Sequence, residues 1–487
     1  MITVTLTSIA HGGEAIGHHE SKIVFVPYAI PGETVEAEIV EEKQRWARAR
    51  LVRVLEPSPD RVLPPCPYFG PGQCSGCQWQ HIAYERQLQL KAEVVADQLR
   101  RLGRIEQPPV LEPIALASET GLLDFGYRNH AQLVTNVEGR LGYVRDGVGQ
   151  GQPRNDAREQ GVRAPGQPAQ DVIAVDECLL LHPLLDEMHG ALLAGIAEAD
   201  VVDVGHLDEE DETPAAQSVI IRRLNLRAGV NTGQRLLAFE TVGDRAPGFV
   251  IEDLPVRCVV RRRDGSIEGL IGEPWIEEEV AGRIFRISAN SFFKVNTTGA
   301  EVMVDLAAEM LAPKGHETLL DAYCGVGLFG LSLVGQVGQV IAIEESEAAC
   351  EDFAWNARDL DNVTLYEGAV EDVLASLGDG LGQEIGNHPG PWLAGSEDRR
   401  GTGPINDTGL RIHMAVIDPP RSGAGPEVIQ HLTRLRVPKL LYVSDDPATL
   451  ARDARLLVEA GYRLEQVQPV DMFPQTYHVE SLALFTR

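Results

Sequence analysis

The sequence lacks the features that mark membrane and secreted proteins. No uninterrupted apolar run approaches the roughly 18 residues that a bilayer-spanning helix requires. The first residues, Met1-Ile2-Thr3-Val4-Thr5, alternate like a strand and contain no basic region followed by an apolar core, so they do not read as a signal peptide. Cysteine is scarce: seven residues in a chain of 487 argue against a disulfide framework. We therefore expect a cytoplasmic protein with no membrane partner.

Positive charge is also in short supply. The formal net charge is −29, from 43 Lys and Arg against 72 Asp and Glu, which argues against a generally basic nucleic-acid binder. The stretch from Lys43 to Arg53 departs from this trend, because it holds five basic residues and no acid. Such a basic stripe on an acidic body can contact phosphates locally. A solvated strand face explains the stripe equally well.

Length and a hydrophobic content of 44% predict two or three domains. Residues 1–60 read as short strands separated by Gly and Pro turns, which predicts a small closed β-barrel. Residues 61–290 mix strands with a helix near Tyr84–Leu102 and predict an α+β central domain. In residues 291–487 helices alternate with strands, which predicts an α/β domain with a parallel sheet. Three stretches have the polar composition of loops or disorder: Gly147–Gln170, Asp203–Ala216 and Gly378–Gly409.

A strand, a glycine turn and a helix follow one another from Thr318 to Gly330, with Gly325 and Gly327 in the turn. Glycines let the backbone approach a ligand closely, and a helix N-terminus offers free N–H groups. Glu344 ends the next predicted strand about 20 residues further on, where an acid can accept hydrogen bonds from a ribose diol. Taken alone, this pattern also fits a nicotinamide cofactor.

Two further carboxyl groups favour S-adenosylmethionine over a nicotinamide cofactor. Asp321 lies just inside the first strand, where it could hold the positively charged amino-acid end of the donor. Asp418 ends a later strand and precedes Pro419 and Pro420, which remove backbone donors and fix the chain beside the transferable methyl group. An ordinary strand-to-loop junction is the alternative interpretation.

Four of the cysteines have the spacing of a metal site. Cys66, Cys74 and Cys77 lie in a Pro/Gly-rich loop, and Cys178 follows much later. Thiolates of a Cys-x2-Cys loop can share one metal or cluster, because the turn brings both sulfurs to one side. The residues themselves leave open a structural zinc, a [4Fe–4S] cluster and unligated cysteines.

These motifs resemble the TRAM-domain, iron–sulfur RNA (uracil-C5)-methyltransferases that act on bacterial 23S rRNA and tRNA, and the resemblance covers essentially the whole chain. Further matching segments are Phe25-Val26-Pro27, Pro31-Gly32-Glu33, Ser58–Val62, Tyr127-Arg128-Asn129, Asn290–Asn296, Tyr442–Leu450 and His478-Val479-Glu480. The resemblance implies an OB-like TRAM barrel that holds RNA and a Rossmann-like class I methyltransferase domain. We expect the protein to be a monomer.

The resemblance also implies roles for single residues. Tyr323, Leu328, Glu344 and Asp418 would line the S-adenosylmethionine site, and Glu480 would be the base that removes a proton. The cysteines Cys66, Cys74, Cys77 and Cys178 match the [4Fe–4S] ligands of the family, which favours a cluster over zinc and gives it a structural role in the central domain.

Two positions depart from the family pattern. Lys294 stands where the family has Gln beside the cofactor, and it would face a cationic sulfonium. Asp445 occupies the position of the nucleophilic cysteine, whose addition to C6 of uracil lets C5 attack the methyl group. A carboxylate is a harder and weaker nucleophile, and Cys324 is interpreted as scaffold rather than as its replacement. Two hypotheses follow: an active RNA methyltransferase, and a catalytically impaired RNA-binding pseudoenzyme.

Overall fold

The computed structural model describes residues 1–118, 121–135, 140–147, 172–198, 220–242, 254–262, 264–378, 392–393 and 411–487. The three polar stretches predicted as loops lie outside the described residues, apart from Gly147, Gly378 and the short strand β20 (Trp392–Leu393). Among the described helices, none combines the length and the apolar character that a membrane crossing requires.

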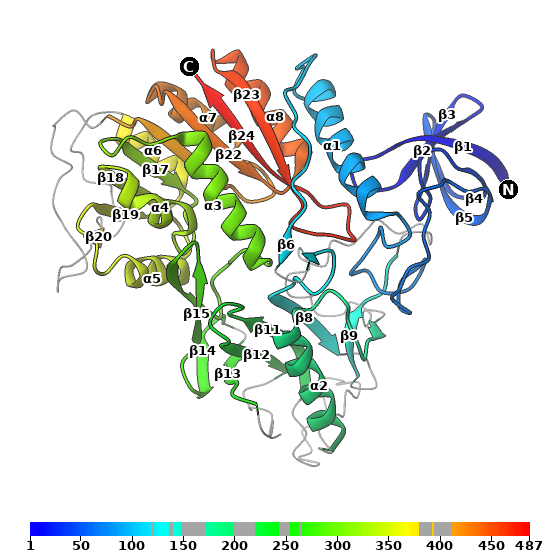
Figure 1. The fold of residues 1–487 in the computed structure, drawn as a ribbon, viewed down its shortest axis with the longest axis horizontal. Helices are drawn as coiled ribbons and strands as arrows, with labels where there is room; N and C mark the ends of the chain where they lie inside the picture. Colours follow the sequence, from blue (N-terminus) through cyan, green and yellow to red (C-terminus); the bar gives the residue numbers. More distant parts are fainter. Residues whose placement is uncertain are drawn as a thin grey trace, which may run out of the picture.

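The N-terminal region is a closed barrel of five strands, drawn in dark blue in Figure 1. Its strands are β1 (Ile2–Ile9), β2 (Ala15–His19), β3 (Lys22–Val26), β4 (Thr34–Glu42) and β5 (Trp46–Glu56), paired in the order β1-β2-β3-β5-β4. Alternate side chains such as Val4, Leu6 and Val35 point inward and fill the interior. Trp79 and Ile82 from beyond the barrel join the same core. The predicted small barrel is confirmed.

The basic stripe lies on β5 and on the turn that precedes it, and acidic side chains face most of it. The ion pairs are Lys43–Glu41, Arg48–Glu14, Arg50–Glu38 and Arg53–Glu36. Arg48 holds the buried Glu14 through two hydrogen bonds, whereas the other three pairs are more exposed and contribute only about 0–1 kcal/mol each, because water screens them. Arg50 and Arg53 can therefore be drawn away from their glutamates by a stronger anion.

The middle of the chain forms a seven-stranded, mostly antiparallel sheet in the order β10-β9-β8-β11-β12-β13-β14. Its strands are β8 (His130–Thr135), β9 (Leu141–Val144), β10 (Val172–Ala174), β11 (Ile220–Ala228), β12 (Arg235–Val242), β13 (Arg257–Arg261) and β14 (Ile267–Ile271). Helix α2 (Pro183–Glu198) packs on this sheet through Leu185, Met188 and Leu192. The short hairpins β6–β7 (Ala117–Ser118, Gly121–Leu122) and β15–β16 (Trp275–Val280, Arg283–Ser288) flank it. This is the α+β region that the sequence predicts.

The C-terminal region contains an eight-stranded sheet in the order β20-β19-β18-β17-β21-β22-β24-β23. Its remaining strands are β17 (Thr318–Ala322), β18 (Gln339–Glu344), β19 (Val363–Glu367), β21 (Met414–Ile417), β22 (Lys439–Ser444), β23 (Arg463–Val470) and β24 (Glu480–Thr486). The strands from β19 to β22 pair in parallel, and β24 is antiparallel to both of its neighbours. Every residue of β17 is buried, as expected for a parallel strand covered on both faces.

Helices cover both faces of this sheet (Figure 1). On one face lie α3 (Thr297–Leu311), α4 (Leu328–Leu333) with the 3-10 turn Val334–Gln336, and α5 (Glu347–Asn356). On the other face lie α6 (Val370–Gly378), α7 (Gly425–Arg434) and α8 (Pro447–Glu459). This arrangement confirms the predicted Rossmann-like α/β region.

Helix α1 (Tyr84–Arg101) joins the barrel to the C-terminal sheet. Its Leu90 and Val94 pack into the barrel core, whereas Val95 and Leu99 pack with α7 and α8. In Figure 1 it stands beside β23 and α8. Residues of α1 thus belong to two cores, and the domain boundaries at residues 60 and 290 stay predictions.

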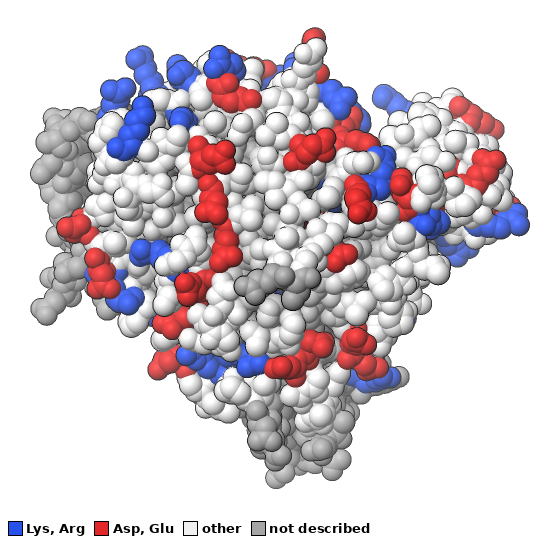
Figure 2. Space-filling model, in the orientation of Figure 1, with Lys and Arg blue, Asp and Glu red and all other residues white. Residues whose placement is uncertain are grey.

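Acidic side chains follow one exposed side of α3. Glu301, Asp305 and Glu309 are spaced four residues apart and therefore lie along one side of the helix. Figure 2 shows a line of acidic side chains running down this face of the molecule. Such a line repels polyanions, so this face is the least suited to contact phosphates.

Candidate active site

Five of the predicted site residues meet at one edge of the C-terminal sheet. Tyr323 follows β17, Glu344 ends β18, Asp418 follows β21 and Asp445 follows β22. Glu480 begins β24, and because that strand is antiparallel to β22 it reaches the same edge. Between β17 and β21 the strand order reverses, which is the place where open α/β sheets bind their ligands.

The loop between β17 and α4 has a backbone that few side chains tolerate. Tyr323, Gly325 and Gly327 have φ angles of 61°, 56° and 100°. A Cβ added at Gly325 would meet no atom within 4 Å, so the loop borders open space. Glu344 fixes the loop by accepting the N–H of Gly325 at 2.9 Å. Leu328 then begins α4, as the predicted strand–turn–helix requires.

Asp321 lies beneath this loop rather than on its surface. It is fully buried, and its Oδ2 accepts the N–H of Gly330 at 2.7 Å. Its other oxygen has no hydrogen-bond partner among the described residues. Burial raises the pKa of Asp321 to about 7. The carboxyl group thus holds α4 against the strand, and its contact with the donor's amino-acid end stays a prediction.

Lys294 bridges two of the carboxylates. Its Nζ lies 2.8 Å from Glu480 Oε1 and 2.9 Å from Asp418 Oδ2, and the residue is only 7% exposed. Burial lowers the pKa of Lys294, but the charges of Asp418 and Glu480 outweigh it, so the net shift is upward and the amine stays protonated. Burial raises the pKa of Glu480 to about 7 against the opposing effect of Lys294. The sequence analysis predicted neither contact, and the expected position of Lys294 beside the cofactor stays a prediction.

Two residues at this edge escaped the sequence analysis. Phe292 is 67% exposed, and the Nζ of Lys294 lies 6.0 Å from the centre of its ring. Arg421 donates from Nε to Asp445 Oδ2 at 3.0 Å. Only their neighbours in sequence, Lys294 and Asp418, could have drawn attention to them. Asp445 is therefore held in an ion pair.

The barrel reaches this edge as well. Asp446 caps α8 by accepting the N–H groups of Ala448 and Thr449. Its second oxygen lies 3.3 Å from the Nε2 of His11, in the turn between β1 and β2. The neighbour of Asp445 thus contacts both the catalytic sheet and the barrel.

Cys324 is enclosed in the glycine loop. It is 6% exposed, and its Sγ donates to the carbonyl of Gly325 at 3.7 Å. Burial, together with the charges of Asp321 and Glu344, raises the pKa of this thiol well above its ordinary value. A protonated, enclosed thiol is a poor nucleophile, which supports its interpretation as scaffold.

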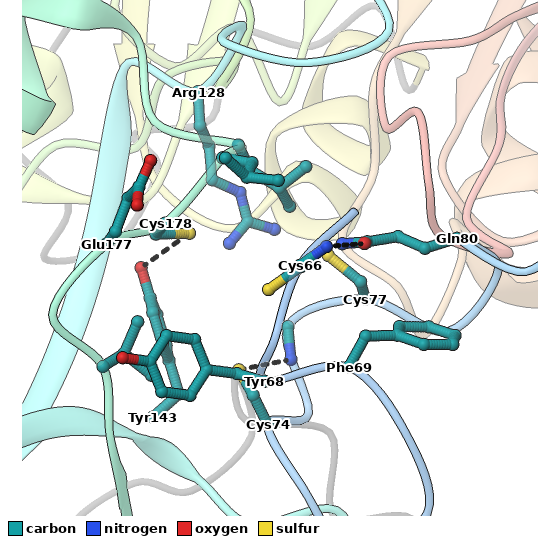
Figure 3. A pocket seen from close by; sticks show the side chains of 14 residues that line it. Cys66, Tyr68, Phe69, Cys74, Cys77, Gln80, Arg128, Tyr143, Glu177 and Cys178 are labelled. Atoms are coloured by element: carbon teal, nitrogen blue, oxygen red, sulfur yellow. Dashed lines mark hydrogen bonds between the residues drawn. The ribbon is translucent and has the colours of Figure 1, made fainter. Parts of the chain in front are cut away.

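The four predicted metal ligands line one pocket (Figure 3). They are Cys66, Cys74, Cys77 and Cys178. Polar groups donate to two of these sulfurs: the Gly76 N–H to Cys74 at 3.4 Å and the Tyr143 hydroxyl to Cys178 at 3.8 Å. Burial raises the pKa of Cys74 to about 12. Within the described residues, no three His, Cys, Asp or Glu side chains have the arrangement that holds a metal ion.

The cysteine loop is hydrogen-bonded to the segment that leads to Glu480. The N–H groups of Gln78 and Trp79, directly after Cys77, donate to the carbonyl of Gln475 at 3.1 and 3.0 Å. The Tyr127 hydroxyl donates to the carbonyl of Pro474 at 3.1 Å. Both contacts position the chain just before β24, on which the predicted base lies.

An open sheet with this strand order and a glycine loop at its switch point defines the Rossmann-like methyltransferase class. Two family models match the chain: TRAM domain over residues 1–52, and tRNA (Uracil-5-)-methyltransferase over residues 251–379 and 400–487. Relatives that are at least 30% identical over 99% or more of this chain are described as RNA methyltransferases. The chain belongs to the tRNA (uracil-5-)-methyltransferase family.

The relatives are proteins described as uncharacterized RNA methyltransferases. That of Halalkalibacterium halodurans is 31% identical over 505 residues, covering 99% of this chain and 96% of the relative. That of Streptomyces coelicolor is 30% identical, covering 99% and 92%. That of Gloeobacter violaceus is 32% identical, covering 100% and 96%. The tRNA (uracil-54, C5)-methyltransferase of Pyrococcus abyssi, solved with S-adenosyl-L-homocysteine, shares the fold over 100% of both chains, with a TM-score of 0.67 and 22% identity.

Proposed function

We propose that the protein transfers a methyl group from S-adenosylmethionine to C5 of a uridine in RNA. The observation that carries this proposal is the meeting of Glu344, Asp418 and Glu480 around the glycine loop at the ligand edge of the sheet, in a member of this family. Retention of all three carboxylates favours an enzyme over the non-catalytic alternative.

The donor would lie across the open space above Gly325. Oε1 of Glu344 accepts the backbone N–H groups of Glu345 and Ser346, whereas Oε2 accepts only that of Gly325 and keeps a lone pair for a ribose hydroxyl. Tyr323 and Leu328 border the same space at the end of β17 and the start of α4. Asp418, next to Lys294, would face the sulfonium end, where Lys294 weakens the attraction that a lone carboxylate exerts.

The acceptor carbon needs help from a nucleophile. C5 of uracil attacks a methyl group only after a nucleophile has added to C6, and a base must then remove the C5 proton so that the C6 bond breaks. We infer that Glu480 is that base, and its raised pKa, which suits proton removal near neutral pH, supports this role. At the nucleophile position the side chain is the Asp445 carboxylate, held by Arg421. We expect its adduct to form slowly and turnover to be correspondingly slow.

The RNA would lie on the barrel and the sheet edge. The paired arginines of β5 can exchange their glutamate partners for phosphates at little cost, whereas the acidic line on α3 turns RNA away from that face. The substrate class is rRNA or tRNA, and we propose that the protein acts as a cytoplasmic monomer.

We also propose a [4Fe–4S] cluster held by the four cysteines of the pocket. The four cysteines, from one loop and from the segment before α2, line the same pocket, and N–H and O–H donors to two of the sulfurs are of the kind that stabilises metal–thiolate groups, which supports this proposal. Bound there, the cluster would supply a structural crosslink between these segments. Zinc is the alternative, and metal analysis distinguishes the two.

The decisive experiment is methyl transfer by purified protein to RNA from a strain that lacks the gene. We expect labelled methyl groups to appear as 5-methyluridine in nucleoside mass spectrometry. Binding of S-adenosylmethionine and RNA without any transfer would instead establish the pseudoenzyme. No binding of S-adenosylmethionine in calorimetry would contradict both.

A further inference from the structure

Arg128 is the one basic side chain among the residues that line the cysteine pocket. Figure 3 shows its guanidinium pointing into the pocket, between Cys178 on one side and Cys66 and Cys77 on the other. Its backbone is held by the segment just after Cys178, because its N–H donates to the carbonyl of Leu180 at 2.8 Å. The side chain is therefore aimed at the sulfurs by the same segment that supplies one of them.

Within the part of the chain that the structure describes, this guanidinium pairs with no carboxylate. Its Nε is buried and has no hydrogen bond among the described residues, and no ion pair joins it to Glu177, the carboxylate that also lines the pocket. A buried, charged donor without an acceptor is costly, and native structures rarely keep one without a reason. Arg128 differs in this respect from Lys294 and Arg421 at the sheet edge, which both have carboxylate partners. An anionic group bound in the pocket would supply the acceptor that Arg128 Nε needs.

We propose that Arg128 is the counter-charge of the metal–thiolate group held in the cysteine pocket, donating hydrogen bonds to its sulfur atoms. The inference rests on the proposed cysteine ligation and adds to it a positioning residue. Four thiolates carry more negative charge than the metal core balances, so a buried group of this kind needs a nearby cation. Gly76 and Tyr143 supply only neutral donors to the sulfurs, and Arg128 supplies the charge.

Two consequences separate this role from simple packing. A cation beside the cluster favours the reduced, more negative form, so Arg128 raises the reduction potential. The same cation destabilises the metal-free protein, in which it has no partner. Removing it should therefore stabilise the metal-free protein and weaken the metal-loaded one, whereas loss of ordinary packing would weaken both.

The test uses the full-length protein, reconstituted without oxygen with iron and sulfide or loaded with zinc, as wild type, Arg128→Met and Arg128→Lys. We expect Arg128→Met to lose metal affinity by about 10- to 100-fold in chelator competition, as outer-shell partners of metal sites do. Its reduction potential, followed by electron paramagnetic resonance, should move to more negative values, while its metal-free form should resist urea better than wild type. Arg128→Lys should keep the potential near that of wild type, because the charge remains, yet lose part of the affinity.

The matched control is Arg140→Met, which removes an exposed arginine lying 3.8 Å from Asp176, near Cys178 but outside the pocket. It should leave potential and affinity unchanged. A wild type that takes up neither iron nor zinc overturns the cysteine site together with the role of Arg128. A wild type that loads metal, with Arg128→Met matching it in affinity, potential and metal-free stability, overturns the role of Arg128 alone.

Discussion

The sheet edge and the cysteine pocket treat their charged groups in opposite ways. At the sheet edge the protein supplies both signs: Lys294 contacts Asp418 and Glu480, and Arg421 contacts Asp445. In the cysteine pocket the guanidinium of Arg128 points between Cys178 on one side and Cys66 and Cys77 on the other, and no carboxylate of the described residues pairs with it. In the first site each cation has a carboxylate partner within the protein, so a ligand must compete with internal pairs. The second is incomplete until a group binds.

The largest expected effect comes from Glu480, which takes part in the internal pairing of the sheet edge. Glu480→Gln removes the carboxylate that takes the C5 proton, so single-turnover methyl transfer should fall by about 10²- to 10⁴-fold. Calorimetric affinity for S-adenosylmethionine should change little, because Lys294 keeps Asp418 as a partner. The control, Glu459→Gln, changes an exposed acid of α8 that pairs only locally with Arg455. Equal rates for the two variants would exclude Glu480 as the base.

Asp445→Cys tests whether the ion pair with Arg421 is what limits the rate. A thiol in this position, beside a cation, has a lowered pKa and adds readily to C6. We expect a gain of about 10²-fold or more in transfer, since covalent nucleophiles commonly contribute that much. RNA containing 5-fluorouridine should form a covalent adduct that survives a denaturing gel.

Asp445→Asn serves as the matched control, because it keeps the shape and removes the charge. It should form no adduct. If Asp445→Cys binds donor and RNA and still gives no adduct, another feature of the site prevents adduct formation. The internal ion pairs of the sheet edge would then not explain slow turnover.

Lys294→Gln removes the cation that both acids share. Because Lys294 lowers the pKa of Glu480, loss of Lys294 should raise that pKa further above about 7. The pH at which the rate rises should therefore increase by roughly one unit. Donor affinity should increase, since a cation no longer faces the sulfonium. A pH–rate profile together with calorimetry checks both. An unchanged profile would mean that Lys294 does not govern the protonation of Glu480.

Sequence reasoning located one of these sites better than the other. Glu344 and Asp418 could be predicted from the sequence, because each lies at the end of an apolar strand and parallel strands bring such ends to one edge of the sheet. Glu480 depended on the resemblance, because it begins an antiparallel strand whose insertion beside β22 no local pattern signals. The contact of Lys294 with Glu480 joins residues 186 positions apart, and only the assembled fold creates it.

The same limit applies to the cysteine pocket. The spacing of Cys74 and Cys77 predicted a shared site, and the structure brings Cys178 to it as expected. Arg128 was visible only as part of a matching segment, since nothing in its surroundings along the chain indicates which side chains it faces. Likewise the helix near Tyr84–Leu102 was predicted, but not that its Leu90 and Leu99 would pack on different cores.

The smallest expected effect concerns the barrel, where exposed pairs resemble the sheet edge in composition but not in burial. Arg50 pairs with Glu38 on the neighbouring strand. Glu38→Gln releases the arginine and should tighten RNA binding slightly, whereas Arg50→Gln should weaken it and lower the slope of affinity against salt by about 0.7 for single-stranded RNA. Unfolding free energies should change by about 1 kcal/mol or less in either variant, because the pair is exposed. If RNA affinity changes in the same direction in both variants, Arg50 does not meet a phosphate. The stripe is then a solvated strand face. If RNA affinity changes in opposite directions, the Arg50–Glu38 pair limits access of the RNA even though water screens this pair. We expect the buried pairs of the sheet edge to limit ligand access more strongly.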